Sequence, residues 1–101
     1  MFRAEIQEGH FHSNLTFYFQ GRLDTEACAN DEKKIDERIA DVVMPIVFDL
    51  KEAVYISSAF LRICIKVGKK IGKEKFTIIN VSPQILKVFK IAGFDNIFTI
   101  K

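Results

Sequence analysis

Cysteine, proline and tryptophan are scarce in this chain of 101 residues, which has two cysteines, two prolines and no tryptophan. Cys28 and Cys64 do not form a Cys-X-X-Cys motif, so the sequence encodes neither a disulfide framework nor a zinc knuckle. We expect both thiols to be buried as small hydrophobic groups and to be unreactive. The scarcity of cysteine therefore argues against a fold held together by cross-links.

Long apolar runs are also absent. No stretch approaches the roughly 20 residues of a membrane span, and the amino terminus MFRAEIQEGH lacks the basic start and apolar stretch of a signal peptide. The composition, 49% hydrophobic and 28% charged, is typical of a globular protein that folds alone. We therefore predict a single domain over residues 1–101 that is cytoplasmic and does not insert into a membrane.

The usual catalytic motifs are missing as well. The chain has no nucleophile elbow or dinucleotide glycine pattern, and VGKKIGKEK lacks the spacing of a phosphate-binding loop. His10 and His12 are two apart and could hold one side of a metal site, but no third ligand lies near them in the sequence, which favours turn residues. We therefore predict neither an enzyme nor a metal site nor a cofactor.

Charge is unevenly distributed along the chain, although the net charge is only +2. Residues 1–50 hold ten acids and five bases, whereas residues 51–101 hold three acids and ten bases. Five lysines between positions 66 and 75 either attract an acidic partner or form the solvated face of a helix. No aromatic platform is interleaved with them, so nucleic-acid binding is not expected.

The hydrophobic pattern switches between the period of a strand and that of a helix. Leu15, Phe17 and Phe19 alternate with polar residues, whereas residues after Asp24 recur at helical spacing behind a capping Asp24 or Thr25. Gly72 and Gly93 are placed to end the second and third helices. The predicted order is strand 2–7, turn 8–13, strand 14–21, helix 25–41, strand 45–50, helix 58–71, strand 75–81, helix 83–92 and strand 96–100.

This order predicts an α/β fold with a mixed, mostly parallel β-sheet of about five strands and about three helices. The continuous apolar runs at 45–50 and 75–81 are typical of strands buried on both faces. In open sheets of this kind binding occurs beyond the carboxyl ends of the strands, which here means the loops 21–25 and 55–58. The apolar arc of helix 58–71 spans about 200°, so either neighbouring helices cover the excess or a partner does.

Three stretches together resemble a STAS domain, the module of bacterial anti-sigma factor antagonists. GRLDTEA resembles the Gly-X-Leu-Asp opening of the family's first helix, and IVFDLKEAVYISSAFL resembles its strand, phosphorylation loop and following helix. FTIINVSPQILKVFKIAGFDNIFTI resembles the carboxyl-terminal strand, Ser-Pro helix and final strand. The resemblance covers about residues 12–100 and implies a STAS-like fold.

The resemblance also implies a switch. In that family, the first serine of an Asp-Ser-Ser-Gly-Leu loop receives phosphate from a partner kinase that is also the anti-sigma factor. Aligned on Leu61, this chain reads Ser57, Ser58, Ala59 and Phe60, so the phosphoacceptor position falls on Ser58. Ser57 replaces the acid, Ala59 replaces the second serine and Phe60 replaces the glycine.

Structural roles compete with these functional ones. Ser58 at a helix start can instead cap a backbone N–H, which is worth about 0.5–2 kcal/mol, although the same position also suits a phosphate. Asp24 resembles the family's acid beside the switch loop, and it is equally suited to cap the first helix. Asp49 ends a buried strand, where it either borders the same surface or makes a structural hydrogen bond.

The resemblance implies an anti-sigma factor antagonist that binds an anti-sigma factor acting as a serine-protein kinase. We expect the contacts to come from Asp24, Ser57, Ser58, Phe60 and Ile63, and the protein to be a monomer or weak dimer. Phosphorylation would add about 1.5–2 negative charges at the interface and release the partner. The alternative is a non-phosphorylated STAS subunit of a larger assembly, such as a lipid-transport ATP-driven system or a stressosome-like scaffold.

Overall fold

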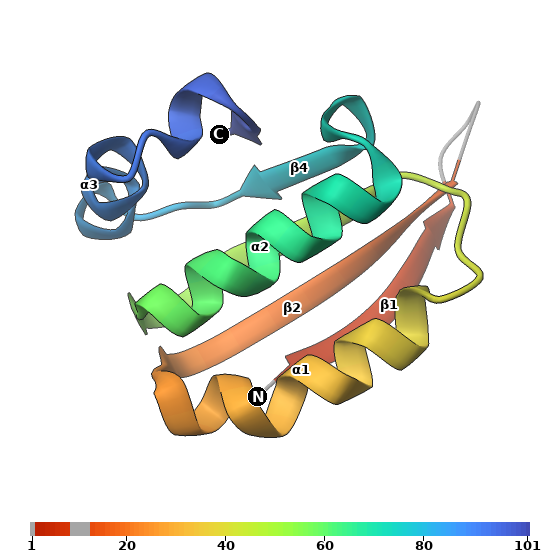
Figure 1. The fold of residues 1–101 in the computed structure, drawn as a ribbon, viewed down its shortest axis with the longest axis horizontal. Coiled ribbons are helices and arrows are strands. Elements are labelled where there is room, and N and C mark those ends of the chain that lie inside the picture. The colour runs from red at the N-terminus through yellow and green to blue at the C-terminus, as the bar shows by residue number, and fades with distance from the viewer. Residues whose placement is uncertain (1, 9–12) are drawn as a thin grey trace.

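The computed structural model describes residues 2–8 and 13–101, and within them five strands form one sheet in the order β1-β2-β3-β4-β5 (Figure 1). β1 pairs with β2 antiparallel, and the other three pairings are parallel. The predicted mixed, mostly parallel sheet is therefore confirmed. The strands are β1 (Phe2–Glu8), β2 (Ser13–Leu23), β3 (Ile46–Ile56), β4 (Phe76–Ile79) and β5 (Thr99–Ile100).

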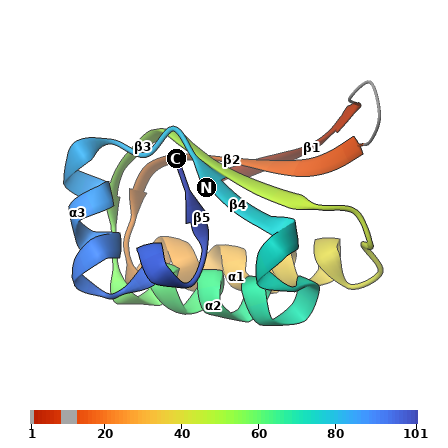
Figure 2. The same cartoon turned by 90° about the horizontal axis from the view of Figure 1, so that it is seen from above.

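Three α-helices connect the strands, as the sequence predicts: α1 (Thr25–Ile39), α2 (Ser58–Ile71) and α3 (Pro83–Ile91). α1 and α2 lie side by side on one face of the sheet, and α3 stands at one end of it (Figure 2). Two short 3₁₀ turns, Lys73–Lys75 and Phe94–Asn96, precede β4 and β5. None of the described helices is long and apolar enough to cross a membrane.

Phenylalanine rings form the core between the sheet and the two helices. The alternation in β2 and β3 points Phe17, Phe19 and Phe48 toward α1 and α2, and all three are buried. The Phe48 ring centre lies 4.8 Å from that of Phe19 and 4.8 Å from that of Phe76, both edge-on. Edge-to-face contacts of this kind add to the burial energy, so the rings stabilise the packing across the neighbouring strands β2, β3 and β4.

β3 is much longer than predicted, because it continues to Ile56 where the sequence indicated an end near residue 50. The pairing with β2 extends as far as Leu23 opposite Ile56, with register shifts on the way. Lys51 and Glu52 interrupt the apolar run that the prediction followed, yet both are exposed and do not disturb the buried face. Residues 53–56 are therefore strand, and the loop before α2 is shorter than expected.

The expectation that β3 and β4 are buried on both faces is wrong. Within the described residues α1 and α2 pack on the same face, and the opposite face of the sheet carries half-buried side chains such as Val47, Thr77 and Ile79. Buried polar groups also occur there: the Thr16 hydroxyl donates to Asn14 Oδ1 at 2.6 Å. This face is partly polar because no helix of the described part covers it.

The sequence left open whether neighbouring helices or a partner cover the wide apolar arc of α2, and the structure answers this in part. α1 packs along one side of α2 and its acids reach the lysine there: Lys66 Nζ donates to Glu32 at 2.7 Å and to Asp36 at 3.0 Å. These bonds raise the pKa of Lys66 above its ordinary value. A neighbouring helix thus covers much of the arc, while Leu61 and Ile65 stay half-buried on the other side.

Candidate functional site

The amino termini of α1 and α2 lie next to each other at one end of the sheet. Leu23, the last residue of β2, is paired with Ile56, the last residue of β3. Asp24 follows the first of these strands and Ser57 follows the second, so the two predicted site residues start adjacent helices. The two predicted loops therefore form one surface, as expected for the carboxyl ends of parallel strands.

Ser57 joins this surface to the end of β2. It is the residue before the first turn of α2, but its hydroxyl makes no capping bond to the helix. The hydroxyl donates to the Leu23 carbonyl oxygen at 2.8 Å, and the Ser57 backbone N–H donates to the same oxygen at 3.1 Å. The side chain of Ser57 therefore points inward and holds the two helix starts together.

Ser58 is the first residue of α2 and its side chain is exposed. The expected capping role is wrong for Ser58, because the capping position belongs to Ser57. Within the described residues the Ser58 hydroxyl makes no hydrogen bond, and the first turn of α2 contains no acid. The hydroxyl thus lies free beside the positive end of the helix dipole, where negative charge is favoured.

Phe60 and Ile63 are not on the surface, so the prediction that they contact a partner is wrong. Their exposed fractions are 1% and 2%. The ring centre of Phe60 lies 5.1 Å from that of Phe19 and 6.0 Å from that of Phe48. Both residues face the sheet because α2 packs this side of its apolar arc on the core, and neither offers side-chain surface to a docked protein.

Asp24 caps α1, which is one of the two roles that the sequence left open for it. Its Oδ1 accepts the Ala27 backbone N–H at 2.9 Å, which caps α1. The side chain is half-buried and also borders a shallow hollow of about 290 Å³ with Arg22 and Glu26. The carboxylate is therefore both the cap of α1 and part of the surface beside Ser58.

Arg22 and Tyr55 lie in the predicted binding loops 21–25 and 55–58, but the sequence did not single them out as contact residues. Arg22 of β2 is paired with Tyr55 of β3, and its guanidinium carbon lies 4.2 Å from the centre of the Tyr55 ring. Tyr55 is 40% exposed, and Val54 beside it is more exposed still. Two adjacent large side chains, Val54 and Tyr55, stand one residue before Ser57 and are exposed, which is the signal that could have revealed this part of the surface.

Both cysteines are buried, as predicted. The Cys28 thiol lies 3.7 Å from the Leu23 carbonyl oxygen that also accepts from Ser57. Burial raises the pKa of Cys28 above its ordinary value and raises that of Cys64 well above it. Neither thiol is available as a nucleophile, since reactivity requires an accessible thiolate.

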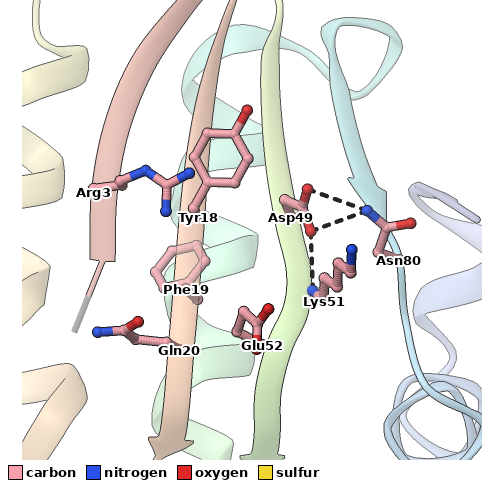
Figure 3. A pocket seen from close by; sticks show the side chains of 8 residues that line it. All are labelled: Arg3, Tyr18, Phe19, Gln20, Asp49, Lys51, Glu52 and Asn80. Atoms are coloured by element: carbon pink, nitrogen blue, oxygen red, sulfur yellow. Dashed lines mark hydrogen bonds between the residues drawn. The ribbon is translucent and has the colours of Figure 1, made fainter.

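The face of the sheet away from the helices carries a polar hollow of about 350 Å³ (Figure 3). Asp49 is held in it by Asn80, whose Nδ2 donates to both carboxylate oxygens at 3.1 Å, and by the Lys51 backbone N–H at 2.9 Å. Asn80 adopts a left-handed φ of 57° to do so. Asp49 therefore makes the structural hydrogen bond that the sequence offered as one alternative.

A metal centre finds no support. The described residues contain no group of three or more His, Cys, Asp or Glu side chains able to hold an ion. His10 and His12, the candidates from the sequence, lie outside the described residues, as does most of the turn predicted between β1 and β2.

Comparison with known proteins decides the family. The STAS domain model matches residues 1–101. The chain belongs to the STAS domain family. A STAS-domain containing protein of Pseudomonas aeruginosa (strain UCBPP-PA14) is 32% identical to this STAS domain over 88 aligned positions, and the match covers 85% of this chain and 86% of that protein.

Solved structures share the fold of this STAS domain. The anti-sigma factor antagonist SpoIIAA in its unphosphorylated form superposes with a TM-score of 0.77 over 100% of this chain and 88% of its own, at 18% identity. An anti-sigma factor antagonist from Mycobacterium paratuberculosis gives 0.77 over 99% and 85%, at 22% identity. RsbS of Moorella thermoacetica gives 0.69 over 98% and 86%, at 13% identity. At these identities the match establishes the SpoIIAA-like fold.

Proposed function

We propose that this STAS domain is an anti-sigma factor antagonist that binds an anti-sigma factor through the surface around the start of α2. Phosphorylation of Ser58 by that partner, acting as a serine kinase, then prevents binding. The observation that carries the proposal is the exposed, unbonded hydroxyl of Ser58 at the amino terminus of α2. The antagonists that share the fold support the choice of partner, and SpoIIAA is known in a phosphorylated form.

The position of Ser58 suits a charge switch. A phosphate there adds about 1.5–2 negative charges at a helix end that tolerates them, so the fold need not change. Arg62 lies four residues further along α2 and is exposed, which is the spacing at which two helical side chains meet. An ion pair between the phosphate and Arg62 would hold the added charge on the docking surface, where it repels an acidic partner.

The docking surface that we propose differs from the one expected from the sequence. It keeps Asp24 and Ser58, and it gains Val54, Tyr55 and Arg22 in place of the buried Phe60 and Ile63. Ser57 contributes by holding the surface together through its bonds to Leu23. This set includes an exposed tyrosine and an exposed arginine, two residue types that are enriched at protein interfaces.

The residues of the loop before α2 favour a second function, that of a non-phosphorylated subunit in a larger assembly. Ser57 stands where the family has an acid, and its hydroxyl is occupied by the Leu23 carbonyl. A STAS domain with this loop is also suited to constant docking as a non-phosphorylated subunit of a larger assembly. In that case the exposed Val54 and Tyr55 would carry the contact, and Ser58 would stay unmodified. Under either proposal the protein acts in the cytoplasm as a binding module. As the switched antagonist it is a monomer or a weak dimer when no partner is bound.

Intact-mass analysis of the protein purified from its own cells, with phosphatases inhibited, separates these functions. The switch predicts a fraction carrying one phosphate-sized increment, which disappears in Ser58→Ala and persists in the matched control Ser57→Ala. An increment that persists in Ser58→Ala refutes the assignment. Complete absence of the increment across growth and stress conditions refutes the switch and leaves the assembly subunit.

Binding supplies the second measurement. The partner that co-purifies with the wild type should be an ATP-binding anti-sigma factor, and its recovery should fall at least tenfold with Ser58→Glu. Arg62→Ala without a phosphate should leave recovery close to the wild type. Recovery of a transporter ATPase or of a scaffold complex, insensitive to Ser58→Glu, contradicts the switch.

A further inference from the structure

A largely apolar groove of about 480 Å³ lies at the far end of α2 from Ser58. Ile65, Gly68 and Lys69 of α2 form one wall, and Ile97 and Phe98, just before β5, form the other, with Lys73 at the end. Ile97 is 49% exposed although it is a large aliphatic residue. Apolar walls with few polar groups and a volume in the range of roughly 300–1,000 Å³ are typical of small-molecule sites.

The two walls of the groove meet at its base, where Phe98 contacts Gly68. A Cβ atom at position 68 would lie 2.2 Å from Phe98 Cε1, so the ring rests directly on the bare backbone of α2. The ring is otherwise enclosed, with an exposed fraction of 8%. Because glycine leaves room for the ring, the groove has a flat apolar base, and only its rim carries charge.

The rim is cationic and its charges are not neutralised. Lys69 and Lys73 are exposed, and in the part of the chain that the structure describes neither forms an ion pair, in contrast to Lys66 with its two acidic partners. Glu74, next to Lys73, and Asp95, two residues before Ile97, do not pair with them in the described residues either. The groove therefore complements a molecule with an apolar body and an anionic end.

We propose that this groove binds a single-chain anionic amphiphile such as a fatty acid. The apolar chain lies against Ile65, Ile97 and Phe98, and the carboxylate is held between Lys69 and Lys73. Burial of the chain supplies most of the affinity: at about 0.8 kcal/mol per buried methylene, each methylene removed weakens binding about fourfold. The two lysines orient the ligand and favour an anion over a cation.

This site is independent of the proposed switch. Lys69 follows Ser58 by eleven residues along α2, which is about 16 Å at 1.5 Å per residue. That separation is about twice the Debye length of roughly 8 Å at physiological salt, so a phosphate on Ser58 acts only weakly at the groove. A ligand in the groove thus binds the modified and the unmodified protein alike.

Titration of the full chain with dodecanoate, followed by amide chemical shifts and calorimetry, tests the proposal. We expect saturable binding at one site, with the largest shifts at Ile65, Gly68 and Ile97. Decanoate, shorter by two methylenes, should bind roughly 15-fold more weakly. Dodecyltrimethylammonium, a cation with the same chain, should bind at the groove at least tenfold more weakly than dodecanoate. Absence of saturable dodecanoate binding, or equal binding of the cation, overturns the proposal.

Variants locate the site. Lys69→Glu with Lys73→Glu should weaken dodecanoate binding at least tenfold, whereas Lys87→Glu with Lys90→Glu, the same charge change on α3, should not. Ile97→Ser removes an exposed side chain and should weaken binding without unfolding the protein. Ser58→Glu should leave the affinity unchanged, so failure of the groove and failure of the switch are distinguishable. Equal effects of the two double variants overturn the site.

Discussion

Substitution of Gly68 by alanine tests the packing of α2 against the carboxyl-terminal segment, because two effects of opposite sign meet at this position. Gly68 is inside a helix, where alanine is favoured over glycine by about 1 kcal/mol. The new methyl group, however, would lie 2.2 Å from Cε1 and 2.7 Å from Cζ of Phe98. Real contacts of a Cβ atom are never so short, so the Phe98 ring or α2 must move.

The ring has little freedom to move. Its centre lies 5.3 Å from that of Phe76 and 5.5 Å from that of Phe94, both edge-on. Overpacking of a filled core costs about 1–3 kcal/mol, and complete loss of a buried Phe contact costs about 3–5 kcal/mol. After the helix gain of about 1 kcal/mol is subtracted from this overpacking cost, Gly68→Ala should lower the free energy of unfolding by up to about 2 kcal/mol.

Urea unfolding of four proteins completes the test: the wild type, Gly68→Ala, Phe98→Leu and the double variant. Leucine has no atoms at the Cε and Cζ positions, so in the Phe98→Leu background the alanine should be close to neutral or stabilising. We expect a coupling free energy of at least about 1 kcal/mol between the two positions. A Gly68→Ala protein that is more stable than the wild type, or the same effect of alanine in both backgrounds, refutes the reasoning.

Two further predictions concern the core. Phe60→Ala should lower the free energy of unfolding by about 3–5 kcal/mol in urea titrations, because the ring is 1% exposed, and a loss below about 1 kcal/mol would contradict its burial. Burial raises the pKa of Cys28 and Cys64 above the ordinary 9.0. The two neutral thiols therefore make their full contribution to the free energy of unfolding below pH 9.0, and this contribution is lost as the pH rises through the raised pKa values. Native protein at pH 9.0 should therefore react with iodoacetamide many-fold more slowly than protein unfolded in urea, and equal rates would show that the thiols are accessible.

The elements that the sequence predicted well are those with strong local signals. α2 runs from Ser58 to Ile71 as expected, because its apolar arc is continuous and Gly72 takes a left-handed φ of 91° that other residues avoid. α3 begins at Pro83 behind the Ser82 cap, whose hydroxyl oxygen accepts the Ile85 N–H at 3.3 Å. Caps, proline and glycine act within a few residues, so a single sequence reveals them.

The features that the sequence missed depend on pairing between distant segments. The long end of β3 exists because its residues pair with β2 about thirty positions earlier, and two exposed charges hide that strand from a hydrophobicity pattern. Ser57 and Ser58 are neighbours with similar chemistry, and only the position of the Leu23 carbonyl decides which hydroxyl is turned inward. Likewise, helical spacing alone did not reveal that Phe60 and Ile63 face the sheet, because the apolar arc of α2 is too wide.

If a partner docks at this surface as we propose, the double hydrogen bond of Ser57 to Leu23 affects the rates of association and dissociation. The two helix starts are fastened to each other before any encounter, so little conformational entropy remains to be lost on complex formation. Association then needs no slow ordering step, and its rate is set by diffusion and charge. In such a preorganised face, one added charge at Ser58 would change the lifetime of the complex without a rearrangement of the chain.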